Sequence, residues 1–195
     1  MTSSPLTNDK QGVVICGPSS AGKGTFIRKL MGDYPFFRHS VSHTTRPPRE
    51  NEHHGVDYFF VTDDEFDLLK SEGAFIETAS VHGYQYGTSY MAINALLDAG
   101  FIPLLDVDVQ GVKSMRSAGL NFVFVFMYAP LETLKQRLLE RNTETSETLE
   151  TRLRTAEEEL KALQTDRHLF DHVMLNDGSV DEGYKRLREL IGVPV

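Results

Sequence analysis

Short apolar runs alternate with longer amphipathic stretches along this chain. Residues 13–16, Val-Val-Ile-Cys, have the length and branching expected of a strand that is buried on both faces. Comparable runs at residues 36–41, 101–107, 122–127 and 172–175 predict four more strands. Strands that alternate with helices through right-handed crossovers form a parallel sheet, so we predict an α/β fold with helices flanking that sheet.

Between these strands, apolar residues recur at helical spacing. We predict helices over residues 23–32, 62–71, 89–99, 110–117, 131–140, 148–163 and 184–191. Thr62 and Glu65 form a capping-box pattern at the start of the second helix, and Gly73 ends it. Residues 75–77, Phe-Ile-Glu, predict one further strand, in which the acid points away from Ile76.

The turn after the first strand carries the clearest chemical signal. Residues 17–23 follow the pattern G-x-x-x-x-G-K between a predicted strand and a predicted helix, which indicates a phosphate-binding P-loop. Most P-loops place a Mg²⁺-binding hydroxyl directly after the lysine, whereas here Gly24 follows Lys23 and the hydroxyl comes at Thr25. The predicted ATP-binding residues of this loop are Gly17, Pro18, Ser19, Ser20, Ala21, Gly22, Lys23, Gly24 and Thr25.

Composition and charge narrow the function classes. With 195 residues, 40% of them hydrophobic, the chain can form a single globular domain with inserted subdomains. A formal net charge of −8 argues against binding to nucleic acids or anionic membranes. One cysteine, Cys16, allows no internal disulfide, and residues 1–10 lack the apolar centre of a signal peptide. We therefore expect a cytoplasmic protein with a disordered tail over residues 1–10.

A polar loop with two arginines follows the second predicted strand. Arg46 and Arg49 flank a rigid proline pair and offer planar guanidinium groups suited to phosphate. Taken alone, this stretch fits a solvated basic loop better than a binding site.

The surrounding motifs add a family resemblance. Residues 42–49, Ser-His-Thr-Thr-Arg-Pro-Pro-Arg, together with Gly-x-Asp-Tyr at 55–58 and Phe-Ile-Glu at 75–77, resemble the GMP-binding region of guanylate kinases. Gly-Lys-Gly-Thr at 22–25 resembles the P-loop of nucleoside monophosphate kinases, and Asp-Val-Asp-Val-Gln-Gly at 106–111 extends the resemblance. It implies a core of residues 11–41, 89–134 and 164–195, a GMP-binding insertion over 42–88 and a helical lid over 135–163.

The resemblance also implies roles for particular residues. Glu77 matches the residue that accepts hydrogen bonds from guanine N1–H and N2–H₂, a donor pair that adenine lacks. The full implied GMP-binding set is Ser42, Arg46, Arg49, Tyr58, Glu77, Tyr86, Thr88 and Asp108. Asp106 would hold water on Mg²⁺, and Asn176 and Asp177 would lie beside the adenine of ATP. With Lys23, the implied catalytic residues are the lid arginines Arg137, Arg141 and Arg152.

These observations predict a guanylate kinase, acting as a monomer or homodimer, that transfers phosphate from MgATP to GMP or dGMP with Mg²⁺ as cofactor. One alternative is a catalytically inactive guanylate-kinase-like module that binds proteins, but Lys23 and the lid arginines argue against it. The other alternative is a kinase for a different phosphorylated acceptor, and Glu77 argues for guanine.

Overall fold

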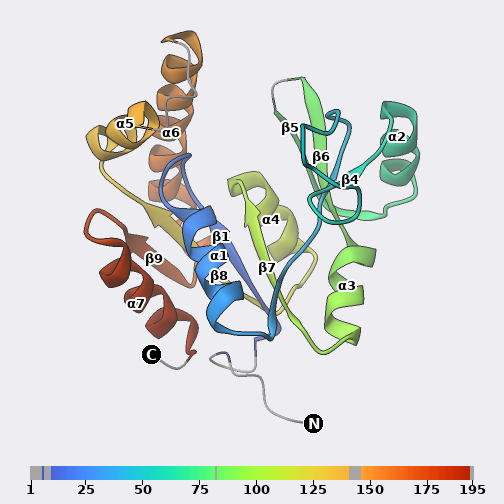
Figure 1. Cartoon of the computed structure of the whole chain (residues 1–195), viewed down its shortest axis with the longest axis horizontal. Helices are drawn as coiled ribbons and strands as arrows, with labels where there is room; N and C mark the ends of the chain where they lie inside the picture. Colours follow the sequence, from blue (N-terminus) through green and yellow to red (C-terminus); the bar gives the residue numbers. More distant parts are fainter. Residues whose placement is uncertain (1–5, 7–9, 82, 141–145, 194–195) are drawn as a thin grey trace.

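The computed structural model describes residues 6, 10–81, 83–140 and 146–193, and it confirms the α/β fold (Figure 1). Five parallel strands form the main sheet in the order β2-β7-β1-β8-β9. Their bounds are Gly12–Cys16 for β1, Phe37–His39 for β2, Ile102–Val107 for β7, Phe122–Tyr128 for β8 and His172–Leu175 for β9. Cys16 pairs with Val107 on one side and Phe126 on the other, so the carboxyl ends of the three central strands meet at one edge.

Alternate residues of β1 face opposite helical layers. Val13 and Ile15 belong to a buried cluster with α1 (Lys23–Asp33) and α7 (Val180–Ile191). Val14 and Cys16 belong to a second cluster with α3 (Tyr90–Asp98) and α4 (Val109–Ser117). All four side chains are fully buried, as expected of a strand inside a parallel sheet that is covered on both faces.

A second, four-stranded sheet stands beside the first, in the order β4-β3-β6-β5 (Figure 1). Its strands are β3 (His43–Thr44), β4 (Phe59–Phe60), β5 (Phe75–Val81) and β6 (Tyr84–Ser89). Helix α2 (Asp63–Ser71) carries the predicted capping box and packs Phe66 against Phe75, with ring centroids 4.6 Å apart. A Cβ on Gly87 would lie 2.9 Å from the Phe75 ring, so this contact needs glycine in β6.

Helices α5 (Leu131–Glu140) and α6 (Ser146–Asp166) lie across from the second sheet (Figure 1). The second half of α6 is attached to the core, since Ala156 is 1% exposed and Leu160 and Leu163 pack against a buried cluster. An ion pair of 2.9 Å between Lys113 and Asp166 fixes its end. The implied lid over residues 135–163 therefore includes a segment, the second half of α6, that packs against the core.

The N-terminal stretch also differs from its prediction at one point. Leu6 is 4% exposed and belongs to the cluster beneath α1 and α7, so the expected disordered tail does not hold at this residue. A short 3-10 helix, Arg167–Leu169, connects α6 to β9. None of the helices in the described ranges is long and apolar enough to span a membrane.

Candidate functional site

The loop after β1 is shaped by two glycines. Gly17 has φ 134°, and a Cβ there would lie 1.9 Å from the Met127 carbonyl oxygen. Gly22, which caps α1, has φ 103°, and a Cβ there would lie 2.5 Å from the Asn176 amide nitrogen. Both glycines of the predicted P-loop pattern are thus required by geometry.

Lys23 is folded back over this loop. Its ammonium group donates hydrogen bonds to the carbonyl oxygens of Gly17, at 2.5 Å, and Pro18, at 3.1 Å. Asp106, at the end of β7, lies 3.6 Å from the same nitrogen. Burial among the surrounding walls raises the pKa of Asp106 and the Lys23 charge opposes that rise, although solvent still reaches 40% of the Asp106 side chain.

Asn176, which follows β9, holds the P-loop in place. It is 6% exposed, and its amide nitrogen donates to the Ala21 carbonyl oxygen at 2.7 Å. A Cβ on Gly183 in α7 would lie 2.5 Å from the Asn176 amide oxygen, so that glycine makes room for the contact. The structure therefore uses the Asn176 amide to fix the P-loop, while Asp177 beside it is exposed.

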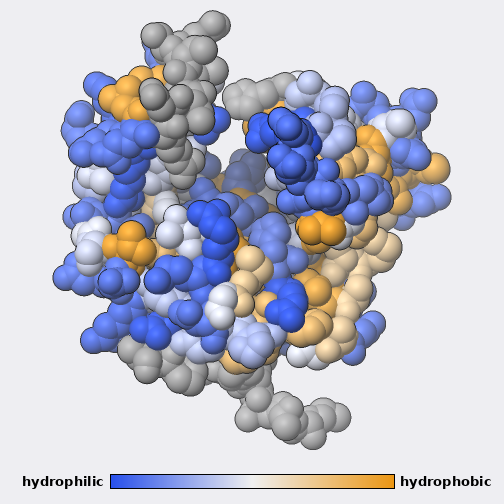
Figure 2. Space-filling view, viewed as in Figure 1, coloured by the Kyte–Doolittle hydropathy of each residue, from blue (hydrophilic) through white to orange (hydrophobic). Residues whose placement is uncertain are grey.

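A cleft of about 760 Å³ lies between the main sheet, the second sheet and α6, and the space-filling view shows the hollow (Figure 2). The structure brings ten of the predicted residues to its walls: Gly17, Ser19, Lys23, Ser42, Tyr58, Glu77, Tyr86, Asp106, Asp108 and Arg152. Residues that are distant in sequence thus form one site at the carboxyl edge of the parallel sheet, where such folds bind ligands.

Glu77 forms a buried acceptor within this cleft. Its side chain accepts hydrogen bonds from the Thr88 backbone N–H, at 3.0 Å, and the Thr88 hydroxyl, at 2.6 Å. The pairing of β5 with β6 is irregular between Phe75 and Glu77, and both Ile76 and Glu77 are buried. Burial raises the pKa of Glu77, and the hydrogen bond from Thr88 opposes that rise. The acid is thus enclosed, unlike an acid on an open strand face.

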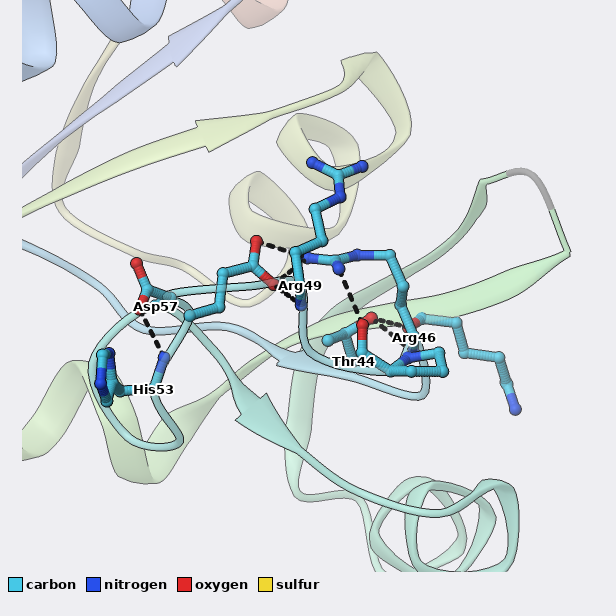
Figure 3. A network of polar contacts seen from close by, with 8 residues as sticks. Thr44, Arg46, Arg49, His53 and Asp57 are labelled. Carbon is cyan, nitrogen blue, oxygen red and sulfur yellow. Dashed lines mark hydrogen bonds and ion pairs between the residues drawn. The ribbon is translucent and has the colours of Figure 1, made fainter.

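The two predicted phosphate-binding arginines lie in the loop that connects β3 to β4 (Figure 3). Arg46 lies over the Tyr58 ring, 5.4 Å from its centroid, and Tyr86 lies 5.9 Å from the same ring. The guanidinium of Arg46 forms an ion pair with Glu52, which was not predicted as a site residue. Arg49 is exposed, and Figure 3 shows its side chain extending away from this pair.

Asp108 both lines the cleft and caps α4. Its carboxylate accepts a hydrogen bond from the Gly111 backbone N–H at 2.8 Å. A Cβ on Gly111 would lie 3.3 Å from a Glu77 carboxylate oxygen, so α4 begins close against the acceptor.

The predicted arginines of α5 and α6 contact the P-loop. Arg152 donates to the Ser19 hydroxyl at 3.2 Å, and Arg137 donates to the Ser20 carbonyl oxygen at 3.4 Å. Arg137 lines a separate cavity of about 280 Å³ together with Thr25 and Asn176. Arg141 lies outside the described residues.

Two further titratable residues line the cleft and were missed. Thr151, Thr155 and Glu159 are spaced four residues apart on α6 and therefore lie on one face of the helix. This spacing was the sequence signal that could have pointed to Glu159. Burial raises the pKa of Glu159 to about 7, the Lys23 charge opposes the rise, and Asp108 and Asp106 add to it. His39, at the end of β2, has its pKa lowered by burial, and Asp106 opposes that change.

Comparisons with known proteins agree on one family. The family model described as guanylate kinase matches residues 9–193. Guanylate kinase 1 of Oryza sativa subsp. japonica is 45% identical over 183 residues, which cover 93% of this chain and 47% of the relative. Guanylate kinase of Sus scrofa is 42% identical over 181 residues, 92% of this chain and 90% of that protein. The chain thus spans about half the length of the plant relative and most of the mammalian one.

Solved structures show the same architecture. The crystal structure of guanylate kinase from Anaplasma phagocytophilum aligns with a TM-score of 0.68 at 28% identity, covering 96% of this chain and 87% of that one. The SH3-kinase fragment of tight junction protein 3 aligns with a TM-score of 0.53 at 14% identity, and this likeness concerns the fold alone.

Proposed function

Because the chain belongs to the guanylate kinase family, we propose that it transfers the γ-phosphoryl group of ATP to GMP, giving ADP and GDP. One observation carries the proposal: the same cleft is lined by the P-loop lysine, Lys23, and by the buried acceptor, Glu77. A phosphate donor and a guanine base held at these two places would lie in the same cleft, which brings the two substrates together for reaction.

The residues of the chain provide positioning and charge compensation, which are the main requirements of phosphoryl transfer. The P-loop backbone and Lys23 would hold the donor phosphates. Arg152 and Arg137, which already contact the loop, would compensate charge on the transferring group. No side chain has to form a covalent intermediate.

The acceptor GMP would be recognised at its base and at its phosphate. Two donors of the guanine edge fit the carboxylate of Glu77, which is oriented by two hydrogen bonds from Thr88. Arg46, Arg49, Tyr58 and Tyr86 would hold the phosphate. The predicted contacts involve base and phosphate and none of them requires the ribose 2′-hydroxyl, which supports dGMP as a second acceptor.

We further propose Mg²⁺ as the cofactor that bridges the donor phosphates. Thr25 and Asp106 offer the hard oxygen atoms that Mg²⁺ prefers, and Asp106 is open to solvent in the cleft. Within the described ranges there is no group of three or more His, Cys, Asp or Glu residues able to hold a metal. Thr25 and Asp106 alone would fit an ion that keeps water and phosphate as its other ligands, with Asp106 acting through water.

A guanylate-kinase-like module that binds proteins and has no activity is the alternative that a test must separate from the kinase. A coupled assay of ADP release with GMP, AMP, CMP and UMP separates the two. The proposal requires turnover with GMP and little with the other three. No turnover with any acceptor, at saturating MgATP, would favour the binding module.

A further inference from the structure

Glu52 contacts both predicted phosphate-binding arginines. Each of its carboxylate oxygens lies 2.9 Å from an Arg46 terminal nitrogen, which donates to both. One of these oxygens also accepts a hydrogen bond from the Arg49 backbone N–H at 2.8 Å (Figure 3). A single carboxylate therefore links the Arg46 side chain to the turn that carries Arg49.

Arg46 is held on its other sides as well. Its second terminal nitrogen donates to the Pro47 carbonyl oxygen at 2.8 Å, and its guanidinium lies over the Tyr58 ring. The side chains of Arg46 and Glu52 are 11% and 18% exposed, so the pair is mostly enclosed by protein. A guanidinium has five N–H donors, and one that is held in this way still has N–H groups to offer a phosphate.

Glu52 is ionised at neutral pH. The Arg49 backbone N–H and the Arg46 guanidinium both lower the pKa of its carboxyl group. Its charge alone would repel a phosphate, but its contacts hold a long side chain that would otherwise have to be ordered by the ligand. These contacts also fix a turn whose two prolines set the separation of the arginines.

We propose that Glu52 is the positioning residue of the acceptor-phosphate end of the site: it orients Arg46 and the Arg49 turn before the ligand binds. This proposal rests on the proposed function, because it takes GMP as the ligand. Glu52 itself touches no substrate and acts through Arg46 and Arg49.

The test compares GMP with guanosine, which has the same base and ribose but no phosphate. Glu52→Gln keeps one acceptor oxygen and turns an amide donor toward donor groups, so the orientation of Arg46 is lost. We expect calorimetric GMP affinity to fall about tenfold and KM for GMP to rise similarly. Guanosine affinity and KM for ATP should remain unchanged.

Glu50→Gln is the matched control, because Glu50 is exposed in the same loop and carries the same charge. It should bind GMP like the unmodified protein, which separates positioning from net charge. Glu52→Asp retains an ionised acceptor and should bind GMP more tightly than Glu52→Gln.

Unchanged or tighter GMP binding by Glu52→Gln would overturn the proposal, and so would an equal loss of guanosine binding. The same holds if Glu50→Gln weakens GMP binding as much as Glu52→Gln. If the unmodified protein binds GMP but does not phosphorylate it, the proposed function fails, while the binding comparison still decides the role of Glu52.

Discussion

Asn176 and Ala21 are 155 positions apart, and the side-chain amide of the first donates a 2.7 Å hydrogen bond to the carbonyl oxygen of the second. Ala21 is fully buried inside the P-loop. The contact therefore ties the loop after β9 to the loop after β1, across the intervening strand β8. Since backbone carbonyls buried without a partner are costly, this link stabilises the particular shape of the P-loop.

Replacing Asn176 should loosen that loop. Asn176→Ala leaves the Ala21 carbonyl oxygen without this donor, and we expect a loss of about 1–3 kcal/mol in the free energy of unfolding together with a higher KM for ATP. Urea denaturation and steady-state kinetics measure the two effects. Asp177→Ala, at the exposed neighbouring position, should leave the free energy of unfolding within about 0.5 kcal/mol of the unmodified value. Equal stability of the two variants would show that the Asn176 contact is unimportant.

Base selection should depend on Glu77. Glu77→Gln places an amide donor where guanine also presents donors, and the unpaired groups should cost about 1–3 kcal/mol. This corresponds to a roughly 5- to 150-fold lower kcat/KM for GMP, measured by the coupled assay. An unchanged kcat/KM for GMP would show that the base is recognised elsewhere.

The Mg²⁺ requirement should depend on Thr25. Because Gly24 follows Lys23, the hydroxyl of Thr25 is the first one available to the metal after the P-loop lysine. Thr25→Ala should raise the Mg²⁺ concentration for half-maximal activity or lower kcat, whereas Thr25→Ser, which keeps the hydroxyl, should behave like the unmodified protein. Superimposable Mg²⁺ titrations of all three would place the metal on other groups.

Arg137 should act on the transition state. A charge that meets only the transferring phosphoryl group lowers kcat and kcat/KM together when it is removed. Arg137→Ala should therefore reduce kcat at least tenfold with KM for ATP little changed. A rise in KM at constant kcat would assign Arg137 to ATP binding alone.

The stability of the protein should depend on pH through Glu159. Its pKa is raised from 4.5 to about 7, so the folded state binds this proton more tightly than the unfolded state does. Ionised Glu159 therefore lowers stability, by an amount that grows between about pH 4.5 and pH 7 and then stays constant, on the order of 3 kcal/mol. Glu159→Gln should raise Tm clearly at pH 8 and only slightly at pH 5.

Glu158→Gln removes the same charge from the exposed side of α6 and controls for net charge. Thermal denaturation followed by circular dichroism at both pH values gives the comparison. A gain from Glu159→Gln that is equal at pH 5 and pH 8 would contradict the linkage.

The sequence predicted the parts of the fold that depend on local pattern. The five strands of the main sheet, the capping box at Thr62 and the P-loop glycines are encoded in runs of neighbouring residues, and their bounds agree within a few positions. Strands β3 and β4 have two residues each and no run to detect, so they form through pairing with distant segments.

The site residues also divide into those that local sequence predicts and those that depend on tertiary contacts. Glu77 could be named from its motif, but its burial and its bonds to Thr88 arise from the β5–β6 pairing. Glu52 and Glu159 look like ordinary surface acids in sequence. Their importance comes from Arg46 in one case and from the enclosing cleft in the other, and both are tertiary contacts.

The attachment of α6 to the core has a mechanical consequence. Ala156 is fixed among buried side chains, and Arg152 lies four residues, or about 6 Å of helix, before it. If α6 pivots at Ala156, a tilt of roughly 20° displaces the helix axis at Arg152 by about 2 Å but moves the start of the helix at Ser146 by about 5 Å. Arg152 lies close to the pivot and therefore moves much less than the start of the helix. A large displacement at Ser146 is thus compatible with an Arg152 side chain that stays beside the P-loop.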